Sequence, residues 1–176
     1  MNPTQKDILD RRSIRKYKTD PVPEELVQAV VDAGLWAPTA RNEQEIKIVC
    51  LRDPALRKQL REDFTASGGR TARPLPFDYE SPVFFFLYGP KDFPYTEMDS
   101  GIVAENMCLA AQSLGLGTVM IGCIRDFMRS PVGAPWREKL GIGEGEIFTL
   151  GLCLGWPDGE AKAPARKEGR YTELKG

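Results

Sequence analysis

The feature that most limits the fold of this chain is an unbroken apolar run at 82–89, with the sequence PVFFFLYG. The run is far shorter than the roughly 20 apolar residues that a membrane-spanning helix needs. A strand with no polar positions has to be covered on both of its faces. We therefore predict a β-sheet with helices packed on each side of it.

The remaining elements follow from apolar spacing and from the positions of Pro and Gly. Strands are expected at 46–52, 82–89, 118–123 and 146–156. Helices are expected at 3–11, 23–37, 54–63, 97–114 and 135–140. This order predicts an α+β fold, a mixed β-sheet flanked by helices on both faces, in a single domain over 1–176.

Two helices carry apolar stripes at the three- and four-residue spacing that predicts a buried face. In the first, the stripe is Leu26, Val27, Val30, Val31 and Leu35. In the second, it is Met98, Ile102, Val103, Met107, Ala110 and Leu114. The segments 64–80 and 124–136 are expected to be loops that cover the substrate face, because loops of that length often have a function.

The chain has no histidine among its 176 residues. This excludes Ser-His-Asp and Cys-His catalysis and any zinc site built on histidine. The four cysteines, at 50, 108, 123 and 153, form no C-x-x-C pair and lie in apolar contexts, so they are interpreted as small buried side chains. No metal site and no catalytic side chain are predicted, and any redox chemistry has to come from a bound cofactor.

The net charge of −1 hides a basic segment at each end of the chain. Segment 11–18 (RRSIRKYK) contains five cations, no acid and one hydroxyl at Ser13, a combination that suits a phosphate monoester. The alternative is that both basic ends are solvated tails. A nucleic-acid role is not favoured, because the segment has a single aromatic residue and no recognisable reading motif.

Four motifs occur in a fixed order along nearly the whole chain. They are RRSIRKY at 11–17, APTARNEQ at 37–44, LGLG at 114–117 running into TVMIG, and LGLCLGWP at 150–157 with a basic tail after it. In this order the chain resembles the FMN-dependent nitroreductase family.

The resemblance implies a phosphate and flavin site at the first motif. Arg11 and Ser13 would hold the FMN phosphate, with Arg12 from the same turn, and Arg15 would place a cation near N1 and O2 of the flavin. For Arg15 the alternative is a surface ion pair. Arg166 matches the family's basic residue that completes the phosphate pocket, with Lys162 and Lys167 as near-equal alternatives.

The resemblance also implies two backbone contacts with the flavin. Pro38, Thr39, Ala40 and Asn42 match a loop that reaches the flavin from the partner subunit. Ile121 and Gly122 match a segment whose amide faces flavin N5. The alternatives are an ordinary helix-terminating loop and a strand glycine that allows close approach to another element.

The sequence departs from the family at two points. It reads Gln44-Glu45-Ile46 where many members have Q-P-W, and Ile121 stands where some members have an acid. Roles are therefore not carried over to Glu45 and Ile46, and the apolar Ile121 leaves the acceptor open.

As a whole, the resemblance implies an FMN-dependent oxidoreductase. It would pass hydride from NADH or NADPH to a nitroaromatic, a quinone or a similar acceptor by a ping-pong mechanism. The protein would be a homodimer with FMN at the subunit interface. Alternatives are a reductive dehalogenase, a flavin reductase or a non-catalytic flavin-binding module. With no apolar leader in the N-terminal sequence, the expected location is the cytosol, without a membrane or nucleic-acid partner.

Overall fold

The computed structural model describes residues 1–71 and 74–175. Its strands are β1 (Lys47–Leu51), β2 (Val83–Pro90), β3 (Gly117–Ile121) and β4 (Glu146–Gly155). Its α-helices are α1 (Pro3–Asp10), α2 (Glu24–Leu35), α3 (Pro54–Ala66), α4 (Thr96–Ser113), α5 (Arg125–Arg129) and α6 (Ala134–Lys139). Two 3-10 turns, η1 (Ala40–Asn42) and η2 (Pro131–Gly133), lie between them.

The four strands form one sheet in the order β1-β2-β4-β3, and every neighbouring pair is antiparallel. The strands therefore form an antiparallel sheet and not the mixed sheet that was predicted. An isolated parallel bridge joins Ser13 to Thr118 at the outer edge of β3. The apolar strand β2 lies in the centre and pairs with β1 on one side and β4 on the other. Its central position explains why it has no polar residue.

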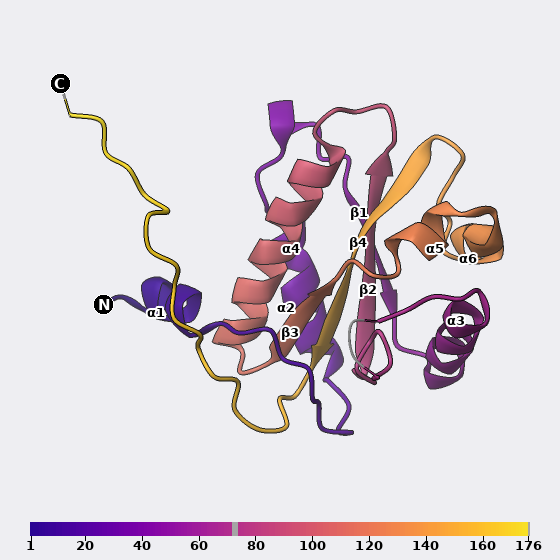
Figure 1. Ribbon diagram of the computed structural model, residues 1–176, viewed down its shortest axis with the longest axis horizontal. Helices are drawn as coiled ribbons and strands as arrows, with labels where there is room; N and C mark the ends of the chain where they lie inside the picture. The colour runs from indigo at the N-terminus through magenta and orange to yellow at the C-terminus, as the bar shows by residue number, and fades with distance from the viewer. Residues whose placement is uncertain (72–73, 176) are drawn as a thin grey trace.

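The sheet is covered on both faces, as the sequence predicts (Figure 1). Phe84 and Phe86 of β2 belong to a core with residues of α3, α5 and α6. Phe85 and Leu87, which point to the opposite face, belong to a second core with α2 and α4. The α+β architecture, with helices on each side, is confirmed.

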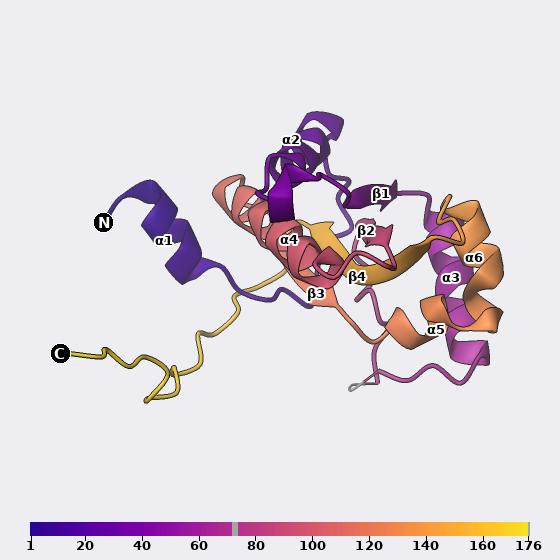
Figure 2. The ribbon, with the colours of Figure 1, turned by 90° about the horizontal axis from the view of Figure 1, so that it is seen from above.

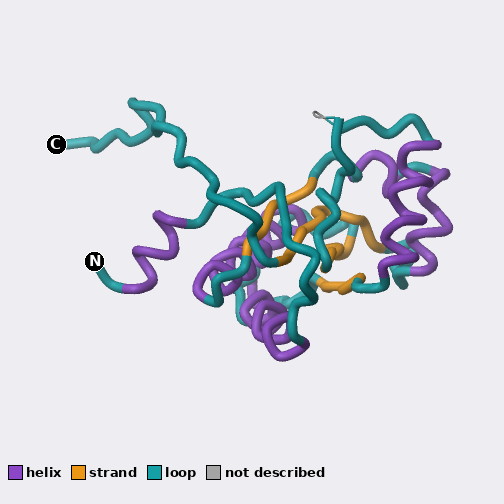
Figure 3. Tube along the Cα trace, turned by 90° about the horizontal axis from the view of Figure 1, so that it is seen from below, coloured by secondary structure: helices purple, strands orange, loops and turns teal. Residues whose placement is uncertain are grey.

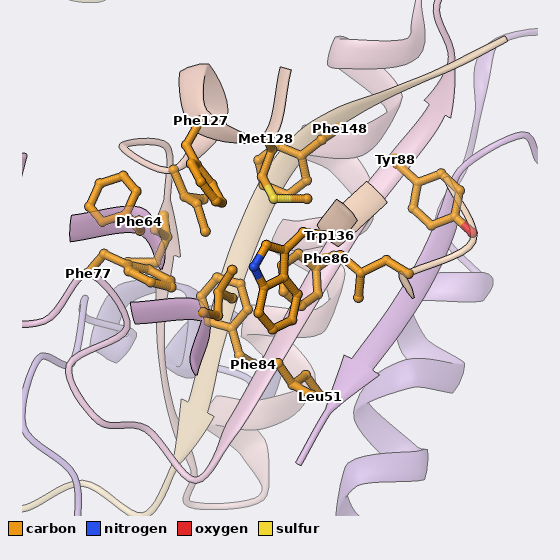
Figure 4. Packing of buried hydrophobic residues seen from close by; sticks show 14 of the residues in the cluster. Leu51, Phe64, Phe77, Phe84, Phe86, Tyr88, Phe127, Met128, Trp136 and Phe148 are labelled. Atoms are coloured by element: carbon orange, nitrogen blue, oxygen red, sulfur yellow. The ribbon is translucent and has the colours of Figure 1, made fainter. Parts of the chain in front are cut away.

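The core under α3, α5 and α6 is rich in aromatic rings (Figure 4). Phe84 and Phe86 meet edge to face with ring centres 4.9 Å apart, and Phe86 meets Phe148 of β4 at 6.2 Å. Trp136 of α6 donates from Nε1 to Asp63 Oδ2 at 2.8 Å, which ties α6 to α3. Edge-to-face pairs of this kind add to the free energy gained by burial.

The opposite face is covered by α2 and α4, which pack side by side (Figure 2). Asn106 of α4 donates from Nδ2 to the carbonyl oxygen of Ala33 at 3.1 Å. The apolar stripes of both helices face this core, with two exceptions. Leu35 and Met98, predicted to be buried, are exposed: Leu35 is the last residue of α2, and Met98 lies in the first turn of α4.

Three further predictions need correction. Phe64, predicted to begin a loop, is buried in the last turns of α3. The predicted loop at 124–136 contains α5, which is stabilised by burying Phe127 and Met128.

Two of the four cysteines, Cys50 and Cys123, are exposed, contrary to the prediction. Cys50 lies on the edge strand β1, and Cys123 lies beyond the end of β3. Cys108 and Cys153 are buried as predicted. The predicted cover at 64–80 includes residues 72–73, which lie outside the described residues.

Both ends of the chain leave the body of the protein on the same side (Figure 3). Helix α1 has no buried residue and contacts α4, and residues 162–175 are exposed. None of the described helices is both long and apolar enough to cross a membrane.

Candidate functional site

The basic segment that follows α1 is attached to the outer edge of β3. Ile14 donates its backbone N–H to the carbonyl oxygen of Thr118 at 2.8 Å, next to the Ser13–Thr118 bridge. The Tyr17 hydroxyl donates to the carbonyl oxygen of Ile14 at 2.8 Å, and Lys18 N–H donates to the carbonyl oxygen of Trp156 at 2.9 Å. These bonds fix the backbone from which the arginine side chains project.

The basic side chains of this segment face those of the C-terminal tail across one cavity of about 380 Å³. The cavity is lined by Arg11, Arg12, Ser13, Arg15, Ala161, Lys162, Pro164 and Arg166. The structure therefore brings together residues from both ends of the chain. Of the three tail cations considered as alternatives, Arg166 and Lys162 line this cavity, and Lys167 is not among its lining residues.

The lining cations are only partly neutralised by the protein. Arg11 Nε lies 3.3 Å from Glu105 Oε1 of α4, but the pair is not aligned for a hydrogen bond. Arg12 donates to the carbonyl oxygens of Leu9 and Arg11, each at 2.6 Å. Within residues 1–71 and 74–175, four lining cations form no ion pair with a carboxylate: Arg12, Arg15, Lys162 and Arg166. The alternative of an ion-paired Arg15 therefore has no support among the described residues.

A cavity with four guanidinium groups, one ammonium group and one hydroxyl favours an anion with more than one charge. Guanidinium groups donate two parallel hydrogen bonds to phosphate oxygens, and charge assistance makes these bonds stronger than neutral ones. The Ser13 hydroxyl adds a neutral donor. The chemistry of this donor set fits a phosphate monoester.

Ile121 and Gly122 lie where β3 ends, further along the same edge strand. The Ile121 side chain is buried in the aromatic core, while Gly122 is exposed. A Cβ added to Gly122 would meet no atom within 4 Å among the described residues. Close approach to another element of the same protomer therefore does not explain this glycine, and its open face leaves room for a planar ligand.

The loop from Pro38 to Gln44 is held against the first turn of α4. Ala40 donates its backbone N–H to Asp99, 3.1 Å from Oδ1 and 3.0 Å from Oδ2. Gln44 N–H donates to Thr39 Oγ1 at 3.0 Å. These hydrogen bonds hold the loop in one conformation against α4. Nothing in the sequence singled out Asp99, because an acid in the first turn of a helix is common.

The turn η1 and the segment that contains Ser13 lie toward opposite ends of α4 (Figure 1). Asp99, which holds Ala40, is in the first turn of the helix, and Thr118, which pairs with Ser13, follows its last turn. From Asp99 to the end of α4 the helix rises about 20 Å at 1.5 Å per residue. Within one protomer, Pro38, Thr39, Ala40 and Asn42 are therefore not brought together with Arg12, Ser13 and Arg15.

None of the four thiols is poised as a nucleophile. Although Cys50 is an exposed residue, partial desolvation of its thiol raises its pKa to about 11, and burial raises the pKa of Cys108 to about 11. It also raises the pKa of Cys123 and, strongly, that of Cys153. Because the thiolate is the reactive form, these cysteines are almost entirely protonated and unreactive at neutral pH.

A second, smaller cavity of about 250 Å³ adjoins Arg15. It lies between residues 15–19 and residues 75–80, and Arg15 lines both cavities. The described part of the predicted cover at 64–80 is thus next to the segment that carries the cations. The segment 75–80 includes Tyr79 and Glu80, which both have a left-handed backbone. Residues other than glycine adopt this backbone rarely, so the sequence does not indicate it at these two positions.

This chain is similar to known proteins over nearly its whole length. The profile of the Nitroreductase family matches residues 8–156. An NADPH-flavin oxidoreductase from Vibrio harveyi is 33% identical over 190 residues, which cover 99% of this chain and 77% of the relative.

Two solved structures have the same fold. A nitroreductase with bound FMN from Bacteroides fragilis superposes with a TM-score of 0.92 at 21% identity, covering 99% of this chain and 100% of that one. The NADPH:FMN oxidoreductase from Vibrio harveyi complexed with NAD+ gives 0.75 at 30% identity, covering 99% and 80%. With the family profile matched from α1 to the end of β4, this chain belongs to the nitroreductase family.

Proposed function

We propose that the protein is an FMN-dependent oxidoreductase whose functional unit is the single domain 1–176. It transfers hydride from NADH or NADPH to a nitroaromatic, a quinone or a similar acceptor by a ping-pong mechanism. Its relatives include an NADPH-flavin oxidoreductase and an oxygen-insensitive NADPH nitroreductase from Salmonella typhimurium. The observation that carries the proposal is the cation cavity built from both ends of the chain.

The residues present fit FMN. The cavity supplies charge-assisted donors for a phosphate monoester, and the open face of Gly122 further along the β3 edge leaves space for a ring. When bound, FMN supplies a site that accepts hydride from the reduced nicotinamide and returns it to the acceptor. No side chain has to carry a proton at neutral pH, which agrees with a chain that has no histidine.

The roles of the residues follow from their chemistry. Arg11, Ser13 and Arg166 hold the phosphate, and Arg12 adds positive charge from the same turn. Arg15 supplies a fixed cation that favours the negative charge of a reduced flavin. The backbone at Ile121 and Gly122 faces the ring, and the absence of a side chain at Gly122 lets the ligand approach.

We further propose that the active form is a homodimer with FMN at the interface. The loop from Pro38 to Asn42 is held at the first turn of α4, whereas Ser13 pairs with Thr118 beyond the last turn, and in this proposal a second copy supplies the loop. Large apolar side chains are exposed beside this loop, with Trp36 at 87% and Met98 at 63%. Helix α1 and the tail beyond Ala161 extend from the body, where a partner subunit can pack on them.

A cytosolic location is part of the proposal. The structure has four free cysteines and no disulfide among its described residues. Free thiols persist in a reducing compartment, and disulfides are rare there.

A flavin reductase is the second candidate, because two relatives have that activity in their names. They are the NADPH-flavin oxidoreductase of Vibrio harveyi and an FMN reductase [NAD(P)H] of Bacillus subtilis, which is 29% identical over 187 residues. In such an enzyme the electron acceptor is free flavin instead of a nitroaromatic or a quinone.

The test is an anaerobic half-reaction with the FMN-loaded protein. Addition of NADH or NADPH should bleach the yellow colour, and a nitroaromatic or benzoquinone should restore it in a second step. Restoration by free FMN alone would favour the flavin reductase. A yellow protein that neither nicotinamide bleaches would contradict both and leave a flavin-binding module.

A further inference from the structure

We propose that Asp99 is a positioning residue for the flavin site. Its side chain fixes the loop that one subunit presents to the FMN held by the other. The inference rests on the proposed function, because it takes the loop from Pro38 to Asn42 as a flavin contact. It adds a residue that neither the motifs nor the family resemblance assigns.

The first argument is the contact itself. Both oxygens of the Asp99 carboxylate accept the same backbone N–H, that of Ala40, at 3.1 and 3.0 Å. The two residues are 59 positions apart in sequence, so the bond joins the loop to α4. Ala40 opens the 3-10 turn η1, and a bond at this residue fixes the position at which the turn starts.

The second argument is the unusual backbone that follows Ala40. Arg41, Asn42 and Gln44 have φ angles of 56°, 57° and 54°, in the left-handed region. Arginine and glutamine adopt this region rarely, since their Cβ crowds the backbone. Three such residues within four positions persist only where surrounding contacts hold them. The Ala40–Asp99 bond at the start and the Gln44–Thr39 bond at the end enclose this stretch.

The third argument is the burial of the carboxylate. Asp99 is 2% exposed, and among the described residues no Lys or Arg forms an ion pair with it. A buried carboxylate needs donors, and the Ala40 N–H is one that reaches both of its oxygens. If the loop moved away, the carboxylate would lose its loop donor. The burial of Asp99 therefore favours one loop conformation over others.

Each of the two segments joined by this bond carries an exposed apolar side chain. Trp36 lies two residues before Pro38, and Met98 directly precedes Asp99 on α4. The Ala40–Asp99 bond thus joins the two segments that carry these side chains. In the proposed dimer, the same bond holds the loop backbone in the shape it presents to the partner's flavin.

The experiment compares FMN and riboflavin binding to Asp99→Ala, Asp99→Asn and Glu97→Gln. Glu97 is the matched control, since it is an exposed acid in the same first turn and contacts Arg129 instead of the loop. Loss of both acceptor oxygens in Asp99→Ala should weaken both flavins by about tenfold or more. Asp99→Asn, which keeps one oxygen, should weaken both by about threefold. Glu97→Gln should bind both as the wild type does.

The equal effect on FMN and riboflavin separates loop positioning from phosphate binding. A loop that contacts the ring or the ribityl chain affects both ligands, whereas loss of a phosphate contact affects FMN alone. The visible absorption bands of the residual bound FMN should also shift, which a uniform loss of folding stability would not produce. Measurements are made well below the melting temperature of each variant.

Wild-type affinity for both flavins in a folded Asp99→Ala protein would overturn the inference. Should Asp99→Ala not fold, wild-type affinity in Asp99→Asn would do so, because that variant is isosteric and has lost one acceptor. A wild-type protein that binds no FMN would instead refute the proposed function, so the two failures are distinguishable.

Discussion

Ile14 packs directly on the bare Cα of Gly117. A Cβ built on Gly117 would lie 2.6 Å from Ile14 Cγ1 and 2.9 Å from Ile14 Cβ, closer than carbon atoms approach. The next residue, Thr118, accepts the backbone N–H of Ile14. The arginine-rich segment is therefore seated on the sheet edge at a point where only glycine fits, with Ser13 and Arg15 on either side of the contact.

Substitution of Gly117 by alanine should displace this segment and weaken FMN binding by about tenfold or more, because Ser13 and Arg15 move with Ile14. Gly145→Ala is the control, since a Cβ there meets no described atom within 4 Å. Fluorescence titration of FMN measures the affinity, and circular dichroism shows whether the sheet is intact. Unchanged FMN affinity in a folded Gly117→Ala protein would contradict the placement of the site.

Removal of two cations, Arg11→Ala together with Arg15→Ala, should reduce FMN affinity severely. One charge-assisted hydrogen bond contributes about 1.5 to 3 kcal/mol, equivalent to roughly a ten- to hundredfold change in affinity. Lys58→Ala is the control, because Lys58 is an exposed cation on α3 paired with Glu62. Full FMN occupancy of the double variant after dialysis would show that the N-terminal motif is not the cofactor site.

Phosphate recognition predicts that FMN binds much more tightly than riboflavin. Riboflavin lacks the dianionic group that the cavity around Arg11 and Arg166 suits. Isothermal titration with both ligands, repeated at two salt concentrations, tests this, since added salt should weaken FMN more than riboflavin. Equal affinities would refute the phosphate assignment and leave the family assignment intact.

The proposed interface predicts that Trp36→Glu shifts the protein toward monomer and lowers its FMN content. A charged side chain at the centre of an apolar interface is costly to bury, and obligate dimers bury roughly 2,000 Å² or more. Val132→Glu is the control, because Val132 is 62% exposed on the opposite side of the sheet. Sedimentation equilibrium gives the mass. A wild-type protein that stays yellow and active as a monomer would exclude the cross-subunit loop.

The cysteines predict a specific labelling pattern. In the folded protein a thiol reagent should modify two sites, Cys50 and Cys123, and in denaturant all four. Since the pKa of Cys50 is raised to about 11, its labelling rate should increase about tenfold per pH unit between pH 7 and 10. Mass spectrometry after brief alkylation counts the sites. Rapid labelling of any cysteine at pH 7 would contradict the raised pKa values.

Most of the secondary structure could be predicted from the sequence because its signals are local. The apolar run at 82–89 required a covered central strand, and Pro54 together with the apolar spacing at 97–114 located two helices. Helix α5 was missed because five residues are too few for a periodic pattern. It is stabilised by the burial of Phe127 and Met128, which depends on the whole core.

The exposure of individual side chains could not be predicted from such local signals. Leu35 and Met98 continue the apolar stripes of their helices, and Cys50 lies in an apolar run, yet all three are exposed. A stripe shows which side of a helix faces the core but not where the core ends. Whether a residue at the end of α2 or α4, or on the edge strand β1, is buried depends on which other helices and strands pack against it.

The sequence by itself determined the family, the two-sided covering of the sheet, and the residue types available for binding a phosphate. Only the tertiary structure decided that the cations at 11–15 and at 162–166 line one cavity, and that Asp99 holds Ala40 across 59 positions. Periodicity and capping act over a few residues, so they appear in the sequence as patterns. Contacts between distant segments depend on how β3 and α4 pack, and the free energy of that packing is spread over the whole core.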